Sequence, residues 1–190
     1  MKKIIIAIDS FKGCLTSAEA GKAAEKGIKS INPFCHTSVI PIADGGEGLL
    51  DVLITATKGK YITLSAHGPL MKMAKTHYGL SGNGRTAIIE MAAISGLPLV
   101  PIEQRNPMLT TTFGTGELIK DALNKGCRNF IIGIGGSATN DAGLGMLQAL
   151  GFRFLDKSGH TLGTGGQIME AVANIDTSGI HPALRETHFM

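Results

Sequence analysis

A carboxylate, a hydroxyl and an ammonium group follow the first apolar run of the sequence. Residues 4–8 (IIIAI) predict a strand buried on both faces, and Asp9, Ser10 and Lys12 come directly after it. The carboxyl ends of parallel strands face the ligand crevice in open α/β sheets. Lys12 could neutralise phosphate charge there, and Asp9 could hold a metal or accept a proton. A solvated loop with a local Asp–Lys pair is the alternative.

A glycine-rich turn with two carboxylates follows the second predicted strand, at 37–42. Asp44 and Glu47 are three residues apart and are separated by Gly45 and Gly46. Carboxylates at this spacing can converge on one cation or hydroxyl, and the glycines permit positive φ and exposed N–H groups. The motif predicts a magnesium or substrate site, with a plain turn before a helix as the alternative.

The most informative segment joins a predicted strand at 129–134 to a predicted helix at 141–150. Free N–H groups and the positive end of a helix dipole at such a junction favour an anion, and phosphate is the obvious one. A tight turn in which Thr139 caps the helix is the structural alternative. The loop residues that we assign to phosphate or substrate binding are Gly135, Gly136, Ser137, Thr139 and Asn140.

Asp141 stands at the start of that predicted helix. Alone, its carboxylate would repel phosphate, but it could bind a Mg²⁺ ion that bridges to the phosphate. Stabilisation of the helix dipole is the simpler explanation for an acidic residue at this position.

The same loop also matches the dinucleotide fingerprint G-x-G-x-x-A, through Gly133, Gly135 and Ala138. Asp156 ends the next short predicted strand roughly 20 residues further on, as in an NAD site. An NAD-dependent oxidoreductase is therefore a second interpretation. Asp141 argues against it, because an uncompensated carboxylate would lie near the pyrophosphate.

Arg105 lies in a polar, proline-containing stretch before a predicted helix that begins near Thr115 and ends at about Asn124. Its planar guanidinium matches the geometry of a carboxylate, so it is a candidate clamp for an acid substrate. Solvation at the surface is the commoner fate of a single arginine.

The elements predicted around these motifs alternate between strands and helices. A capping box at Thr16 opens a helix that runs to Ile31, and a second helix is predicted at 49–57, so the first part has the β–α–β–α order of a parallel sheet. We expect an α/β protein with a parallel sheet begun by residues 1–60. Residues 61–190 would form a second, smaller α/β domain that contains the glycine-rich loop and an antiparallel patch, with strands at 60–66, 74–80 and 86–91.

Composition excludes several classes of protein. Hydrophobic residues make up 43% of the 190 residues, which argues against disorder, and the net charge of +3 without a dense basic run argues against nucleic-acid binding. The first apolar run stops at Asp9, and no stretch approaches the ~18 apolar residues of a membrane helix. Three widely spaced cysteines fit a reducing compartment, so we expect a cytoplasmic protein.

The motifs, taken together and in order, resemble those of the bacterial type 1 glycerate kinases. The resemblance covers nearly the whole chain, and its matching segments are AIDSFKG (7–13), PIADGGEG (41–48), GPL (68–70), EMAA with SGLPL (90–99), RNP with TTTFGTGELI (105–119) and GIGGSATND (133–141). Members of this family are about twice as long. We therefore expect this chain to be a fragment or the product of a truncated gene, corresponding to the N-terminal half.

The resemblance implies an ATP- and Mg²⁺-dependent kinase that converts D-glycerate to phosphoglycerate, with 2-phosphoglycerate favoured. It also implies a Rossmann-like α/β domain and a second, smaller α/β domain, with the site in the cleft between them. We assign Lys12 to charge neutralisation, Arg105 to the glycerate carboxylate, and Asp44, Glu47 or Asp141 to Mg²⁺ or to the base, without apportioning these roles. A truncated relative that binds a nucleotide or an acid without turnover stays open, as does a homo-oligomer.

Overall fold

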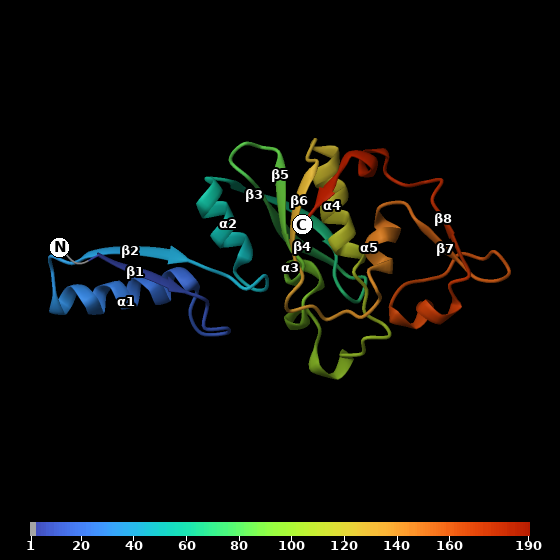
Figure 1. The fold of residues 1–190 in the computed structure, drawn as a ribbon. Helices are drawn as coiled ribbons and strands as arrows, with labels where there is room; N and C mark the ends of the chain where they lie inside the picture. Colours follow the sequence, from blue (N-terminus) through green and yellow to red (C-terminus); the bar gives the residue numbers. More distant parts are fainter. Residues whose placement is uncertain (1–2) are drawn as a thin grey trace.

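The computed structural model describes residues 3–190 (Figure 1). Its strands are β1 (Lys3–Ile8), β2 (His36–Pro41), β3 (Lys60–His67), β4 (Met73–Leu80), β5 (Thr86–Glu90), β6 (Asn129–Gly133), β7 (Arg153–Leu155), β8 (Asn174–Asp176) and β9 (His188–Phe189). Its α-helices are α1 (Ser17–Ile31), α2 (Leu49–Thr57), α3 (Ala92–Ser95), α4 (Phe113–Asn124) and α5 (Leu144–Ala149). Short 3₁₀ helices lie at Leu97–Leu99, Ile102–Gln104, Gly166–Ala171 and Pro182–Glu186. No helix within residues 3–190 is both long enough and apolar enough to cross a membrane.

Strands β1 and β2 pair in parallel and form, with α1, a unit that extends away from the rest of the chain (Figure 1). The predicted capping box is confirmed, because Thr16 Oγ1 accepts a hydrogen bond from Glu19 N at 3.2 Å and Thr16 N donates to Glu19 Oε2 at 2.9 Å. Gly21 lets α1 approach β2 closely, since a Cβ there would lie 2.4 Å from Val39 Cγ1.

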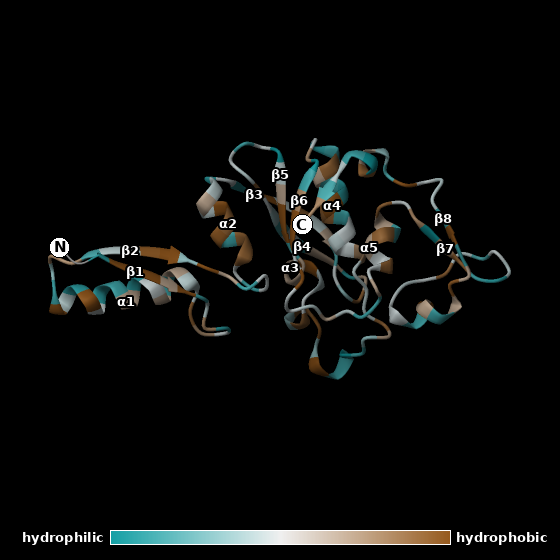
Figure 2. Ribbon diagram, in the orientation of Figure 1, coloured by the Kyte–Doolittle hydropathy of each residue, from teal (hydrophilic) through white to brown (hydrophobic). Residues whose placement is uncertain are grey.

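The prediction that β1 is buried on both faces is wrong for the part of the chain that the structure describes. Helix α1 packs on one face, where Ile6 is only 6% exposed, but Ile5 on the other face is 59% exposed. Ile40 of the paired strand is 47% exposed. Both strands contain hydrophobic residues (Figure 2), and some of these side chains therefore lie on a sheet face that no other element covers among residues 3–190.

The larger sheet has the strand order β3-β4-β5-β6-β9. Its first three strands pair antiparallel, as the alternating pattern of residues 60–91 predicts, and β5, β6 and β9 then pair in parallel. The α/β class is confirmed, and this sheet is mixed. The parallel pairing of β5 with β6 places the ends of both strands at one edge.

Helices cover both faces of the large sheet. On one face α2 contributes Leu50 and Ile54, which pack with Ile88 of β5. On the other face α4 contributes Leu118 and Ile119 to the main core. Helix α2 thus packs on the large sheet, although the predicted first unit, residues 1–60, includes it. The division into domains stays a prediction.

Helix α5 begins at Leu144, three residues later than the helix predicted at 141–150. The backbone has positive φ at Ala142 (51°) and Gly143 (76°), and this left-handed conformation interrupts a helix. The glycine-rich loop after β6 therefore leads into a turn before the helix begins.

Candidate functional site

Lys12 and Asp44 form an ion pair with 2.8 Å between Nζ and Oδ2. Lys12 follows β1, Asp44 follows β2, and the parallel pairing of these strands brings their carboxyl ends together. Ser17 Oγ reinforces this junction, because it donates to the Ile8 carbonyl at 2.6 Å and accepts from Ile42 N at 3.1 Å. Both charged side chains stay more than half exposed, so the pair adds little stability and remains open to a ligand.

The charges around this pair shift its two pKa values in opposite directions. The hydrogen bond from Lys12 lowers the pKa of Asp44, and the N–H of Gly46, 3.1 Å from Asp44 Oδ1, lowers it further. The pKa of Lys12 is raised, first by Asp44 and then by the charges of Asp9 and Glu47. The charge of Lys12 is therefore stabilised by three carboxylates, of which Asp44 contacts it directly.

The glycine-rich loop after β6 lies directly against the turn after β2. Gly135 N donates to the Gly45 carbonyl at 3.2 Å. A Cβ on Gly133 would lie 2.6 Å from that carbonyl oxygen, and a Cβ on Gly135 would lie 2.7 Å from the Cα of Gly46. The glycines are required for this backbone contact, which joins two of the predicted motifs.

These motifs line one cavity of about 530 Å³, which we call the glycine-lined cavity. Seven predicted site residues contribute to it: Lys12, Asp44, Gly45, Gly46, Glu47, Gly135 and Gly136. Its remaining wall comes from Leu49, from residues 131–134 and from Met190.

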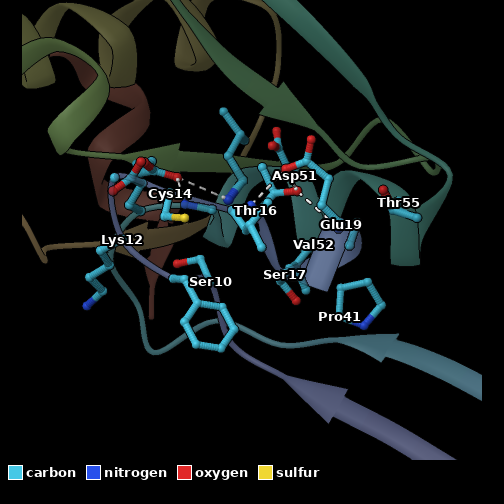
Figure 3. Close-up of a pocket in the computed structure, with 18 of the residues that line it drawn as sticks. Ser10, Lys12, Cys14, Thr16, Ser17, Glu19, Pro41, Asp51, Val52 and Thr55 are labelled. Carbon is cyan, nitrogen blue, oxygen red and sulfur yellow. Dashed lines mark hydrogen bonds between the residues drawn. The ribbon is translucent and has the colours of Figure 1, made fainter. Parts of the chain in front are cut away.

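A second cavity of about 430 Å³, the Ser10 cavity, lies between the loop after β1 and α2 (Figure 3). It shares Lys12 and Glu47 with the glycine-lined cavity. Ser10 Oγ is buried here and has no hydrogen-bond partner among residues 3–190. A buried hydroxyl without a partner is a group that a ligand can satisfy.

Glu90 also lines the Ser10 cavity, although no sequence motif assigns it a role in the site. Its Oε2 accepts hydrogen bonds from Gly48 N at 3.1 Å and from Leu50 N at 3.3 Å. Desolvation raises the pKa of Glu90, with help from the charges of Asp51 and Glu47, while the two N–H groups oppose the shift. Two signals were available in the sequence: the carboxylate that ends the apolar run AIIE, and the family segment EMAA, which begins with Glu90.

Asp141 lies outside both cavities and is only 1% exposed. Its carboxylate accepts hydrogen bonds from Thr112 N (2.8 Å), Thr112 Oγ1 (2.9 Å) and Thr111 Oγ1 (3.2 Å). The N–H groups of Gly143 and Gly145 also donate to it, at 3.1 and 3.2 Å. These bonds occupy the oxygens that a metal would need, so they favour a structural role. The predicted catalytic and metal roles of Asp141 stay predictions.

The rest of the loop after β6 turns away from the cavities. Ser137 and Thr139 bond each other, with 2.7 Å between their hydroxyl oxygens, and Ala138 N donates to the Ser95 carbonyl at 2.8 Å. Neither cavity is lined by Ser137, Thr139 or Asn140. Their predicted phosphate contacts have no support from this arrangement.

Two further predicted residues lie at the margin or away from the site. Asp9 Oδ1 accepts from Ser10 N at 2.6 Å, and its charge acts on Lys12. Arg105 is exposed, and its Nε donates to the Val100 carbonyl of its own loop at 3.2 Å. Arg105 lines neither cavity, so its role as a carboxylate clamp stays a prediction.

The structure around this loop does not match a dinucleotide-binding Rossmann unit. In a Rossmann unit the next strand pairs in parallel beside the first, but β7, which precedes Asp156, pairs antiparallel with β8 in a separate sheet. In addition, α5 begins only at Leu144, too late to present its N-terminus to a pyrophosphate held by Gly135.

Among residues 3–190, no three His, Cys, Asp or Glu side chains are grouped so that they could hold a metal ion. Any Mg²⁺ at this site would therefore take one or two carboxylates and complete its shell with phosphate oxygens and water, as is common for this ion.

Comparison with known proteins gives one consistent result. The model of the glycerate kinase family matches residues 4–190. A glycerate kinase of Bacillus subtilis is 54% identical over 96% of this chain and 48% of its own length. The glycerate 2-kinase of Escherichia coli is 49% identical over 97% of this chain and 48% of its own length.

The structural comparison agrees. A crystal structure of a protein assigned as glycerate kinase 2 from Salmonella typhimurium LT2 matches with a TM-score of 0.87 and 47% identity, over 99% of this chain and 50% of that one. This chain thus spans about half the length of the relatives it matches. Family model, sequence relatives and fold all lead to the same conclusion: the chain belongs to the glycerate kinase family.

Proposed function

We propose that this chain carries the phosphoryl-transfer site of an ATP-dependent kinase that phosphorylates D-glycerate, with 2-phosphoglycerate as the favoured product. The observation that carries the proposal is the ion pair of Lys12 and Asp44, both of which line the glycine-lined cavity. Phosphoryl transfer depends mainly on positioning and on charge stabilisation, and this site offers both a cation and carboxylates on well-defined strand ends.

The glycine-lined cavity fits a phosphate chain. Within residues 3–190, no protein hydrogen bond engages the backbone N–H of Gly45 or of Gly136, and no atom within 4 Å would meet a Cβ on Gly45. Backbone N–H groups in positive-φ turns are common anion ligands, and Lys12 adds a full positive charge beside them. Bound ATP would supply the phosphoryl group that is transferred.

Asp44 and Glu47 are the residues that we propose to hold Mg²⁺, because both line the same cavity as Lys12. The low pKa of Asp44 keeps this carboxylate ionised at neutral pH, as a metal ligand must be. Asp9 is the remaining carboxylate near Lys12 and is our candidate for accepting the proton of the glycerate hydroxyl.

The Ser10 cavity is our candidate for the part of the reactants that lies beyond the transferring phosphate. It adjoins the glycine-lined cavity through Lys12 and Glu47, and the Ser10 hydroxyl lacks a protein partner within residues 3–190. We propose the cytoplasm as the compartment, since three widely spaced cysteines suit a reducing environment.

A coupled assay of ADP release tests this function. The 190-residue chain is incubated with Mg·ATP, with and without D-glycerate, and a glycerate-dependent rate is expected. Thermal shifts with Mg·ATP, with ATP plus a chelator and with NAD provide the matched binding test. A shift with Mg·ATP but no glycerate-dependent ADP release would make the chain a binding module instead of an enzyme.

A further inference from the structure

Glu90 ends β5 and reaches across to a segment that is 42 residues away in the sequence. Its Oε2 accepts from the N–H of Gly48 at 3.1 Å and from the N–H of Leu50 at 3.3 Å. Gly48 is the last residue of the glycine-rich turn, and Leu50 lies in the first turn of α2. One carboxylate oxygen therefore bonds the turn and the helix together.

Helix α2 has no capping side chain of its own. Its N-cap is Gly48, with φ of 90°, and no side chain of the local sequence accepts from the first N–H groups. These N–H groups need an acceptor, and they carry the positive end of the helix dipole. Glu90 supplies a negatively charged acceptor from a different strand, so the start of α2 depends on a tertiary contact.

The other side of the turn is held by the loop after β6. Gly135 N donates to the Gly45 carbonyl at 3.2 Å, and Met91 N, next to Glu90, donates to the Gly133 carbonyl at 2.9 Å. The end of β5 is thus bonded to the turn at Gly48, and the loop after β6 is bonded to it at Gly45. Glu47 lies between the two bonded residues, Gly45 and Gly48, and Asp44 directly precedes Gly45.

Glu90 lies beside the site but apart from Asp44. It lines the Ser10 cavity, to which Lys12 and Glu47 also contribute, and does not line the glycine-lined cavity that contains Asp44. The oxygen that bonds Gly48 and Leu50 is committed to the protein backbone.

We propose that Glu90 is a positioning residue, which holds the turn of residues 44–48 so that Asp44 and Glu47 face Lys12 during phosphoryl transfer. This role rests on the proposed function. It requires a hydrogen-bond acceptor at position 90, whereas the negative charge itself is secondary. Glutamine keeps the acceptor, and methionine has a similar length without one, so the two substitutions separate the hydrogen bond from side-chain packing.

The experiment compares Glu90→Gln and Glu90→Met with the unmodified chain, and uses the exposed Glu103→Gln as a control. Amide hydrogen exchange of Gly48 and Leu50, followed by NMR, reports the contact directly. We expect exchange about tenfold faster or more in Glu90→Met, and close to the unmodified rate in Glu90→Gln.

Glycerate-dependent ADP release then separates positioning from simple stability. We expect Glu90→Met to lower kcat about tenfold or more with a much smaller change in KM for ATP, and Glu90→Gln to restore most of the rate. Unchanged kcat in Glu90→Met, or equal losses in both variants, would overturn the positioning role. Absence of ADP release from the unmodified chain would overturn the proposed function itself, and the positioning role with it.

Discussion

Lys12 Nζ lies 2.8 Å from Asp44 Oδ2, although 32 residues separate the two in the sequence. The pair joins the ends of two parallel strands. Lys12 lines both the glycine-lined cavity and the Ser10 cavity, and Asp44 lines the glycine-lined cavity. This single contact unites two of the motifs that the sequence offers for phosphoryl transfer.

Asp141 is expected to be essential for stability. Replacing it with alanine leaves the buried N–H and hydroxyl groups of Thr112 without their acceptor, which should lower the free energy of unfolding by about 2–4 kcal/mol. Urea unfolding followed by circular dichroism measures this, with the exposed Glu170→Ala as control. An Asp141→Ala chain of unchanged stability that no longer releases ADP would instead support a role in metal binding or catalysis.

Two glycines in helices are expected to respond to alanine in opposite ways. A Cβ on Gly27 in α1 would meet no atom within 4 Å, so Gly27→Ala should raise the free energy of unfolding by about 0.5–1 kcal/mol. In Gly114→Ala the new Cβ would lie 1.9 Å from the His67 carbonyl oxygen, a clash that should cost about 1–3 kcal/mol. Denaturant unfolding of both variants checks the signs, and a stabilising Gly114→Ala would contradict the close packing of α4 against β3.

Both tyrosines should resist ionisation in the folded chain. The bond from the Tyr61 hydroxyl to Asp51 raises the pKa of Tyr61 to about 12, and burial, then the bond to Asp121, raises that of Tyr78 further. Because the folded pKa of Tyr61 exceeds its ordinary value of 10.0, the resulting stability is present below pH 10 and is lost as the pH rises towards 12.

Phenolate absorbance during an alkaline titration measures this directly, since the chain contains no tryptophan. The unfolded chain in denaturant serves as the reference, and Asp51→Asn should lower the pKa of Tyr61 selectively. Phenolate formation near pH 10 in a chain that is still folded would contradict the contact with Asp51.

Local patterns predict most of the elements, because their causes are local. The capping box at Thr16, the β-branched run at 4–8 and the helix end at about Asn124 each depend on neighbouring residues, and the structure has the corresponding elements. The exposure of Ile5 could not be predicted, because it depends on which segments cover the second sheet face. The late start of α5 could not be predicted either, because it follows from the conformation of Ala142 and Gly143 and the tertiary bonds of Asp141.

The candidate site shows the same division. Lys12, Asp44 and the glycines after β2 and β6 were identifiable, because strand ends of an α/β fold gather at one edge. Glu90 was not, because its partners lie 42 and 40 residues away and share no pattern with it. The sequence motifs also predicted roles for Ser137, Thr139 and Arg105. In the structure their side chains bond to nearby residues of their own loops, and only tertiary packing determines these partners.

The most direct test of the account is the rate of ADP release from Mg·ATP in the presence of D-glycerate, measured for Lys12→Ala beside Lys157→Ala, an exposed control. If Lys12 stabilises the transferring phosphoryl group, the glycerate-dependent rate should fall about a hundredfold or more in Lys12→Ala and stay unchanged in Lys157→Ala, with both chains folded. A Lys12→Ala chain that keeps the rate of the unmodified chain would remove Lys12, and with it the cavity that it lines, from the reaction.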